Sequence, residues 1–260
     1  MCKISVVTIC FNNLEDLKRT CRSVDEQSEY PYEHWIIDGS QTNDISDWLG
    51  STPQPFYRKW ICEPDKGIAD AFNKGIQRST GDAVQLLNAA DEYAADNVLA
   101  VVAKTFDQDT SFQWLTGKIY MTRVGSKVLV GKAFDPKKLY RGMRSVSHPT
   151  WFVRRKVYDE LGDYDLRYKI AMDYDMMCRL KNYKSVFLDF PLVDFDDSGI
   201  STHNYLAALK ETKRVYQTHF GYSFKMELWQ MRLRLLHLLQ KTPLGKFLFS
   251  IKRKLGLENF

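Results

Sequence analysis

The stretch Glu63–Tyr93, EPDKGIADAFNKGIQRSTGDAVQLLNAADEY, decides the fold of this chain. It opens with a polar loop, and apolar residues then recur at the three- and four-residue spacing of a helix. A short apolar run at Ala83–Leu87 follows the helix, and Asp91 comes soon after it. A helix that leads into a buried strand with an acidic residue beyond its end is typical of an α/β protein. In such proteins the ligand lies beyond the carboxyl ends of the strands.

The flanking sequence continues this alternation of strands and helices. We predict strands at Ile4–Cys10, Trp35–Ile37 and Tyr57–Cys62, and helices that begin near Asn13, at Asp44 and near Asp96. Asn13 and Asp96 are expected to cap their helices. The pattern predicts a mostly parallel central sheet with helices on both faces. Polar residues are then expected at or just after the strand ends: Thr8, Asn12, Asp38, Asp65 and Asp91.

The second half of the chain is less regular. The sequence predicts strands at Phe112–Thr116, Lys118–Val130, Thr150–Val153 and Val186–Phe190, an irregular basic segment at Pro136–Ser147 and a helix at Asp173–Leu180. From Tyr205 onward we expect only helix, with a break at Thr242-Pro243. We therefore divide the chain into one α/β domain at 1–204, with halves at about 1–110 and 111–204, and a helical C-terminal extension at 205–260.

Composition describes a globular protein. The 260 residues are 44% hydrophobic and 13% aromatic, and five scattered cysteines indicate reduced thiols in a cytoplasmic protein, with no disulfide framework or zinc site. No apolar run is long enough to cross a membrane, and Met1–Ser5 does not resemble a signal peptide. The net charge of +5 arises in 225–260, where eight Lys/Arg and two Glu sum to +6, so the other 224 residues sum to −1. We expect no nucleic-acid partner.

The motifs together resemble those of family 2 glycosyltransferases with a GT-A fold, of the bacterial type that assembles colanic acid, capsule or O-antigen. The resemblance covers about 200 residues and is carried by Ile4–Thr8, Asp38–Ser40, Glu63–Gly67, Asp70–Gly75, Leu87-Asn88 with Asp91, Ser147–Pro149, Asp173–Asp175 and Ser198–Ser201. It implies inverting transfer of a hexose from a nucleoside diphosphate sugar to a lipid-linked glycan. UDP-hexose is the commonest donor in the family, and undecaprenyl diphosphate is the expected lipid carrier.

The resemblance also implies a set of donor-binding residues. Asp38-Gly39 could instead be only a turn, Asp65–Gly67 only a helix entry, and Asn12 only a loop residue. Asp70 and Asn73 are three residues apart and are expected to share a helix face. The donor contacts implied are Thr8, Asn12, Asp38, Gly39, Ser40, Asp65, Lys66, Gly67, Asp70, Asn73 and Arg144.

Asp91 is the candidate ligand for Mn²⁺ or Mg²⁺. Such an ion neutralises a diphosphate leaving group and needs few protein oxygens. Relatives often carry two acidic residues here, whereas this chain has Ala90 at one of the two positions, and Glu92 is expected to point away. His148 is a second candidate beside the metal or diphosphate, although a lone histidine is more often structural.

Asp173 is the candidate general base, because inverting transfer needs a carboxylate to accept the proton of the acceptor hydroxyl. Its place at a helix start makes capping the alternative role, and cap bonds with the helix dipole would keep it ionised. Asp175 is the second choice. Asp194 and Asp196 could bind a cation, but we interpret them as part of a loop.

The C-terminal tail combines basic residues with apolar residues on one helical side: Leu228, Met231, Leu235, Leu238 and Leu239. This pattern favours an anionic membrane surface, and so a peripheral position on the inner face of the cell membrane. Packing on the body, or in a homodimer, is the alternative. A noncatalytic sugar-nucleotide-binding protein of the same fold is the alternative function, to be tested by donor hydrolysis with Mn²⁺.

Overall fold

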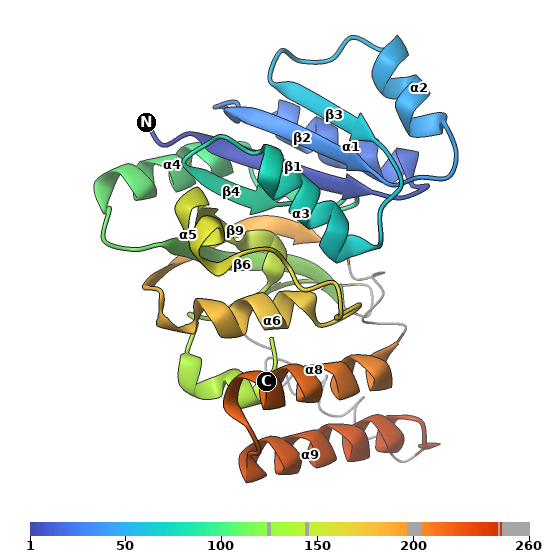
Figure 1. Ribbon diagram of the computed structural model, residues 1–260, viewed down its shortest axis with the longest axis vertical. Coiled ribbons are helices and arrows are strands. Elements are labelled where there is room, and N and C mark those ends of the chain that lie inside the picture. The colour runs from blue at the N-terminus through green and yellow to red at the C-terminus, as the bar shows by residue number, and fades with distance from the viewer. Residues whose placement is uncertain (124–125, 144–145, 197–203, 244, 246–260) are drawn as a thin grey trace.

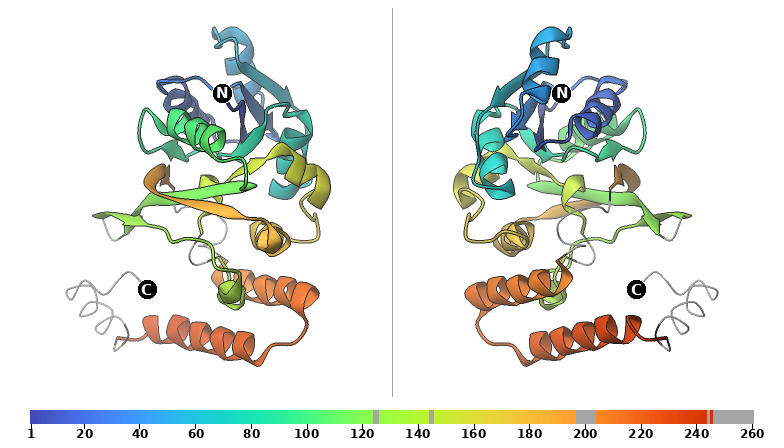
Figure 2. Two further views of the ribbon diagram at one scale, coloured as in Figure 1. Left: turned by 90° about the vertical axis from the view of Figure 1, so that its left-hand side faces the viewer. Right: turned by 90° about the vertical axis from the view of Figure 1, so that its right-hand side faces the viewer.

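The computed structural model describes residues 1–123, 126–143, 146–196, 204–243 and 245. A curled central sheet with flanking helices forms the upper part of the molecule in Figure 1, and two long helices lie below it. In the side views of Figure 2 these two helices form a separate layer under the sheet.

The first half of the chain is a regular strand–helix alternation. Its elements are β1 (Ile4–Cys10), α1 (Leu14–Asp25), β2 (Glu33–Asp38), α2 (Asp44–Ser51), β3 (Arg58–Cys62), α3 (Ile68–Arg78), β4 (Ala83–Leu86), β5 (Glu92–Tyr93) and α4 (Val98–Gln108).

The second half is mixed. Its elements are β6 (Trp114–Arg123), β7 (Ser126–Val130), the 3₁₀ helices η1 (Pro136–Arg141) and η2 (His148–Thr150), β8 (Phe152–Arg154), α5 (Arg155–Leu161), α6 (Met172–Arg179), the 3₁₀ helix η3 (Leu180–Asn182), β9 (Ser185–Phe195), α8 (Tyr205–Phe220) and α9 (Phe224–Gln240).

The strands form one sheet in the order β3-β2-β1-β4-β8-β6-β9-β5, and β7 pairs with β6. The parallel pairing that the sequence predicts holds from β3 to β4. Beyond β4 the sheet is mixed, because β8 runs antiparallel to both β4 and β6, while β9 runs parallel to β6. The parallel half thus brings the carboxyl ends of four strands to one edge.

Helices cover both faces of the parallel half. Neighbouring residues of β1 belong to different cores: Val7 packs with α3 residues, and Val6 packs with α4 residues. A third cluster joins α1 and α2 to Cys10 and Ile36. Strands buried on both faces read as continuous apolar runs, which is why Ile4–Cys10 could be predicted residue for residue.

The C-terminal helices are packed onto the body. Helix α8 lies against α6, and α9 lies against α8 and η1 (Figure 1). Trp229 of α9 donates its indole N–H to the carbonyl of Arg141 at 3.2 Å. None of the described helices combines the length and the apolar character needed to cross a bilayer.

Several local predictions need correction. Asn13 does not cap α1, because its Oδ1 accepts from the N–H of Phe11 at 2.9 Å. The N-cap of α4 is Asn97, not Asp96, and it makes no side-chain cap bond. The basic segment expected to be irregular contains η1, which Asp135 caps by accepting from the N–H of Lys137.

Other strand boundaries also shift. The strand predicted at Phe112–Thr116 is the first part of β6. The strand predicted at Lys118–Val130 comprises the rest of β6 and the paired strand β7, and residues 124–125 lie outside the described residues. The strand expected at Thr150–Val153 is β8, two residues later, and β9 is longer than Val186–Phe190. Two short elements, β5 and α5, were not predicted from the sequence.

Candidate active site

The candidate site lies at the carboxyl ends of the parallel strands. Cys10, Asp38 and Cys62 are partners in adjacent strands, so β1, β2 and β3 end at one level. Backbone bonds continue beyond these ends, from Gly39 N to Cys10 O at 3.1 Å and from Ala89 N to Ile9 O at 3.1 Å. The loops that carry the predicted donor and metal residues are therefore neighbours.

Side chains tie the first two of these loops together. Asp38 is buried and accepts from the N–H of Ser40 at 2.9 Å. The Ser40 hydroxyl accepts from the N–H of Asn12 at 2.8 Å, and the Asn12 amide oxygen accepts from Gln41 N at 3.0 Å. Asn12 has φ 53°, an unusual value for a residue other than glycine. The predicted residues Asn12, Asp38 and Ser40 thus form one ordered loop cluster.

Asp65 is positioned by two glycines. Gly39 leaves room for it, because a Cβ on Gly39 would lie 1.9 Å from Asp65 Oδ2. Gly67 has φ 111° and donates its N–H to Asp65 Oδ1 at 2.7 Å. Glycine is the residue that adopts such a φ without strain. The Asp65–Gly67 turn therefore brings a half-buried carboxylate against Gly39.

Two side chains of α3 bind the loop that precedes this helix. Asp70 accepts from the backbone N–H of Lys66 at 2.9 Å. Lys74 donates to the carbonyl of Pro64 at 2.7 Å and pairs with Glu63 at 3.1 Å. Asp70 therefore stabilises the 63–67 loop through this hydrogen bond. The side chain of Lys66, in the same loop, is exposed and carries a positive charge.

Two of the predicted donor residues turn inward. Thr8 is fully buried, and its hydroxyl lies 2.9 Å from Nε2 of the buried His34. Asn73 is 6% exposed and holds the backbone of Tyr164, donating to its carbonyl at 2.9 Å and accepting from its N–H at 2.7 Å. Asp70 and Asn73 therefore do not present a common face to a ligand, and the structure gives Thr8 and Asn73 structural contacts. Arg144, also predicted, lies outside the described residues.

Asp91 is buried at 2% exposure, in the turn that follows β4. Its Oδ1 accepts from the N–H of Asp196 at 3.1 Å, while its Oδ2 is buried with no hydrogen-bond partner. The amide oxygen of Asn88, three residues earlier, is also buried without a partner. Two unsatisfied oxygens in one turn are a costly arrangement unless another group completes it.

Burial, helped by the negative charge of Asp196, raises the pKa of the Asp91 carboxyl to about 8, against the opposite effect of hydrogen bonding with the backbone of Asp196 and with Asn88. Hard divalent cations prefer carboxylate and amide oxygens and retain water and phosphate ligands beside them. The donor set of Asp91 and Asn88 fits such an ion. No group of three or more His, Cys, Asp or Glu that could hold a metal occurs among the described residues, so the remaining ligands of a metal here would be water and substrate.

The turn that carries Asp91 is held in place by α1. Thr20, fully buried, donates its hydroxyl to the carbonyl of Asp91 at 2.8 Å and accepts from Ala90 N at 3.0 Å. Ala90 has φ 84°, a strained value for a side chain with a Cβ. Sequence reasoning missed Thr20, because no local pattern links it to a turn 70 residues away.

His148 is 5% exposed and lies in an aromatic cluster with Phe72, Trp151 and Tyr164. Its Nε2 lies 3.0 Å from the Tyr164 hydroxyl and 3.6 Å from Asp173 Oδ1, and burial lowers its pKa. No contact links it to Asp91. The structure thus associates His148 with the predicted base rather than with the metal turn.

Asp173 has one buried oxygen that makes no hydrogen bond. About a quarter of its side chain is exposed, yet Oδ1 is buried, and His148 Nε2 lies 3.6 Å from it. Burial raises its pKa, partly offset by His148. The expectation that cap bonds would keep this carboxylate ionised is therefore wrong, since the N-cap position of α6 is Ala171 and Asp173 makes no cap bond.

Asp175 has a different environment. It is buried, and its two oxygens lie 2.8 Å from His219 Nε2 and 2.9 Å from the Arg179 guanidinium. His219 belongs to α8, so its contact joins α6 to α8, whereas Arg179 lies one turn further along α6. The geometry therefore favours Asp173 over Asp175 as the carboxylate available for chemistry.

Phe11 is a residue that sequence reasoning missed. Its ring is 54% exposed directly after β1, next to Asn12 and near Asp38. An exposed aromatic ring at a strand end provides a surface on which a nucleobase can stack. The available signal was a large apolar residue in an otherwise polar loop.

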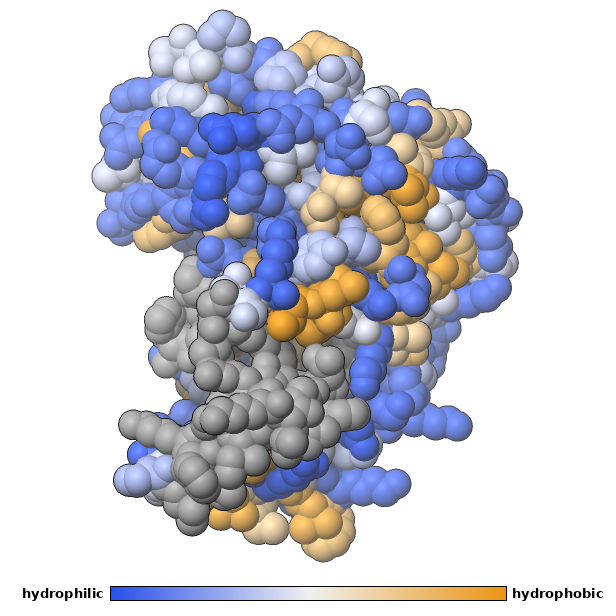
Figure 3. All heavy atoms as spheres, turned by 180° about the vertical axis from the view of Figure 1, so that it is seen from behind, coloured by the Kyte–Doolittle hydropathy of each residue, from blue (hydrophilic) through white to orange (hydrophobic). Residues whose placement is uncertain are grey.

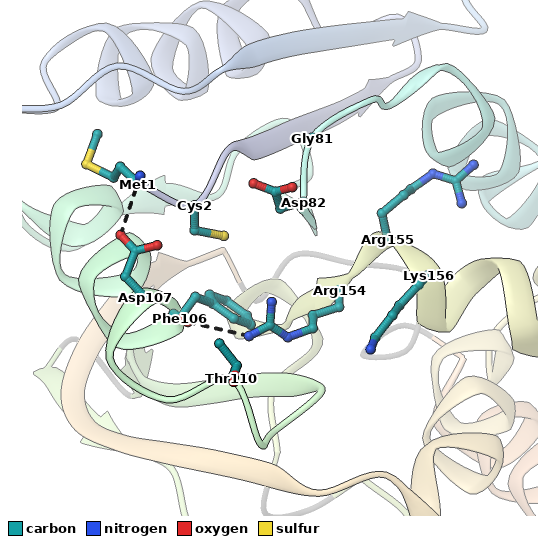
Figure 4. Close-up of a pocket in the computed structure, with 10 residues that line it drawn as sticks. All are labelled: Met1, Cys2, Gly81, Asp82, Phe106, Asp107, Thr110, Arg154, Arg155 and Lys156. Atoms are coloured by element: carbon teal, nitrogen blue, oxygen red, sulfur yellow. Dashed lines mark hydrogen bonds and ion pairs between the residues drawn. The ribbon is translucent and has the colours of Figure 1, made fainter.

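Two cavities lie at opposite edges of the sheet. One of about 330 Å³ is formed by the loops and first turns of α1 and α2, including Asn12, Asp16 and Asp44. The larger one, of about 520 Å³, lies at the amino ends of β1 and β4 (Figure 4). Its Arg154 donates to the carbonyls of Phe112 and Phe106. Size alone does not make this second cavity the active site, because the free carboxylate oxygens lie elsewhere.

Comparison with known proteins finds glycosyltransferases. The family model described as glycosyl transferase family 2 matches residues 5–162. An uncharacterized glycosyltransferase of Mycobacterium tuberculosis H37Rv is 30% identical over 225 residues, which are 85% of this chain and 86% of that protein. A PGL/p-HBAD biosynthesis glycosyltransferase of Mycobacterium bovis BCG is 26% identical over 177 residues, 67% of this chain and 68% of that one.

The fold is similar to that of solved glycosyltransferases. The mannosyltransferase PcManGT from Pyrobaculum calidifontis, solved with GDP-Man and Mn²⁺, superposes with a TM-score of 0.61 at 13% identity. The alignment covers 98% of this chain and 81% of that one. The expected GT-A architecture is confirmed.

Proposed function

This chain belongs to glycosyl transferase family 2, and on that premise we propose that it transfers a hexose with inversion from a nucleoside diphosphate sugar to a lipid-linked glycan. The observation that carries this proposal is a pair of buried carboxylate oxygens without hydrogen-bond partners, Asp91 Oδ2 and Asp173 Oδ1. One belongs to the turn after β4, and the other to the first turn of α6. A transferase needs one carboxylate on the leaving-group side and another on the acceptor side.

The donor would bind over the loop cluster after β1, β2 and β3. Phe11 offers an exposed ring for the base, and the loop held by Asp38 offers polar groups for base and ribose. Lys66 contributes a cation toward the diphosphate. UDP-hexose is the first donor to test, and GDP-mannose, which the solved mannosyltransferase binds, is the second.

A divalent ion, Mn²⁺ or Mg²⁺, would be held by Asp91 with the amide oxygen of Asn88. When bound it supplies charge neutralisation for the diphosphate leaving group. The chain itself keeps Asp91 in place through Thr20 and through the backbone N–H of Asp196. The raised pKa of Asp91 favours the protonated carboxyl until a cation is present.

Asp173 would act as general base. Its carboxylate accepts the proton of the acceptor hydroxyl as the oxygen of that hydroxyl forms a bond to C1 of the hexose. The bond from C1 to the phosphate oxygen breaks on the opposite face, so an α-linked donor gives a β-linked product. A raised pKa suits this role, because the base must hold the proton after transfer.

The acceptor is proposed to be presented at a membrane. Helix α9 exposes Leu228, Met231 and Leu235, with Arg232 and Arg234 also exposed. Seen from behind, hydrophobic residues reach the surface at the lower end of the molecule, where α9 lies (Figure 3). An anionic bilayer matches this combination of leucines and basic residues. The protein would then be peripheral on the inner face of the cell membrane.

The test is a panel of nucleotide sugars with Mn²⁺, read first by thermal stabilisation and then by transfer to lipid-linked acceptors. Binding raises the apparent stability of the folded protein. We expect one donor to shift the melting temperature and to turn over. If a donor stabilises the protein but is neither hydrolysed nor transferred to any of the acceptors, the result would contradict the proposal.

A further inference from the structure

We propose that Glu211 of α8 is a positioning residue for Asp173, an inference that rests on the proposed function. Its carboxylate accepts three consecutive backbone N–H groups, from Lys169 at 3.0 Å and from Ile170 and Ala171 at 2.6 Å each. These residues form the approach to α6, and Asp173 follows two residues after Ala171. A residue 38 positions beyond the base thus fixes the backbone that carries it.

The N–H groups that Glu211 accepts belong to Lys169, Ile170 and Ala171, and Ala171 is the N-cap residue of α6. Glu211 therefore holds the chain where it enters the helix, just before the first turn. Asp173, the second residue of α6, makes no cap bond, and its Oδ1 makes no hydrogen bond. Glu211 thus fixes the position of the base without a bond to its carboxylate.

Helix α8 makes further contacts with α6 and with the segment that precedes it. His219 lies 2.8 Å from Asp175 Oδ1, and Tyr168 donates to Thr218 at 3.4 Å. Lys169, whose N–H Glu211 accepts, donates its side chain to the carbonyl of Lys66 in the predicted donor loop at 3.1 Å. The segment clamped by Glu211 thus connects the donor loop with the base.

The experiment compares Glu211→Ala, Glu211→Gln, Asp173→Asn and the double variant Asp173→Asn/Glu211→Ala. A shift of a catalytic group by about 1 Å can lower the rate of transfer by as much as 100-fold. We expect Glu211→Ala to reduce kcat by about tenfold or more while nucleotide diphosphate affinity stays within about twofold. Glu211→Gln keeps an acceptor oxygen and should recover part of that loss.

The double variant separates positioning from general stability. If Glu211 acts through Asp173, its removal should cost less than about twofold in the Asp173→Asn background, because coupled residues are not additive. Glu227→Gln is the matched control. Like Glu211, Glu227 is a carboxylate that joins two segments, because it pairs with Lys213 of α8 at 2.7 Å, but it belongs to α9 and not to the contact with α6. It should leave kcat unchanged.

Wild-type kcat in Glu211→Ala, beside an impaired Asp173→Asn, would overturn this inference alone. So would an equal loss in both backgrounds, or a loss that only follows the fraction of folded protein. Wild-type transfer by Asp173→Asn would instead overturn the base assignment itself. Should Glu211→Ala fail to fold, Glu211→Gln carries the same comparison.

Discussion

Gly39 and Asp65 fit together with no space for a side chain between them. A Cβ on Gly39 would lie 1.9 Å from Asp65 Oδ2 and 2.7 Å from its Cγ, well inside van der Waals contact. The backbone of Gly39 lies outside the left-handed region, so its glycine is explained by this contact and not by a special φ. The close approach joins the loop after β2 to the loop after β3.

Gly39→Ala should therefore displace Asp65 and weaken donor binding. We expect the affinity for the nucleoside diphosphate to fall by about tenfold, measured by calorimetry, with a modest fall in melting temperature. Gly50→Ala in α2 is the control, because nothing lies within 4 Å of a Cβ there. If both variants bind the nucleotide as tightly as wild type, Asp65 does not contact the donor.

Asp91→Asn should abolish stabilisation by Mn²⁺ and greatly reduce Mn²⁺-dependent turnover while the fold remains intact. The asparagine Oδ1 can still accept from Asp196 N, so this backbone donor keeps its partner. The melting temperature with and without Mn²⁺ is the measurement. Glu92→Gln, at a half-exposed neighbour that pairs with Arg19, should respond to Mn²⁺ like wild type. Full turnover of the wild type in excess chelator would rule out the metal.

The affinity for Mn²⁺ should depend on pH through Asp91, whose pKa burial raises to about 8. A cation binds the carboxylate, so affinity should fall by about tenfold per pH unit below pH 8 as the proton competes. The stability of the metal-free protein should move the other way. The raised pKa contributes stability that is full below about pH 4 and is lost as the pH rises through about 8. Titrations of Mn²⁺ between pH 6 and 8.5 check this, and a flat profile would count against Asp91 as ligand.

Asp173→Asn should leave donor affinity near wild type and reduce transfer by about 100-fold or more, the scale of a lost general base. Asp175→Asn should mainly lower thermal stability, because it removes a buried carboxylate that pairs with His219 and Arg179. Donor affinity, transfer rate and melting temperature are measured for both. A loss of donor binding in proportion to activity in Asp173→Asn would show that this residue is not the base.

Truncation before Lys241 should weaken binding to anionic vesicles, and added salt should weaken the full-length interaction by screening. Leu235→Gln, at a side chain of α9 that is 59% exposed, should also reduce binding. Leu206→Gln is matched to it, because Leu206 is 50% exposed on α8. Equal sedimentation of every variant with vesicles would leave α9 as a surface for packing or for a second copy.

The sequence predicted those strands, helices and strand-end residues whose structure depends on neighbours a few positions away. The β-branched run at Ile4–Cys10 and the periodicity of α3 predicted both elements, and the strand ends led to Asp38, Asp65 and Asp91. Asp91 in particular needed only its position after a buried strand. These inferences depend on spacing of a few residues, which a single sequence contains.

Side-chain direction could not be predicted in the same way. Thr8 belongs to a strand buried on both faces, so alternation does not tell whether it meets a ligand or His34. His148 was expected near the metal, but aromatic residues from distant segments surround it. Glu211 was not identified at all, because three N–H groups 40 residues earlier give no signal in the sequence around it.

The double hydrogen bond between Asn73 and the backbone of Tyr164 has a mechanical consequence. It connects a helix of the first half to the segment that precedes α6, and both bonds are buried. A hinge motion that separated these two segments would break both hydrogen bonds. Each buried polar group left without a partner would cost about 1–3 kcal/mol. Substrates should therefore enter and leave by movement of loops at the rim while the two halves remain joined. Amide exchange at Tyr164 should accordingly be slow both with and without nucleotide.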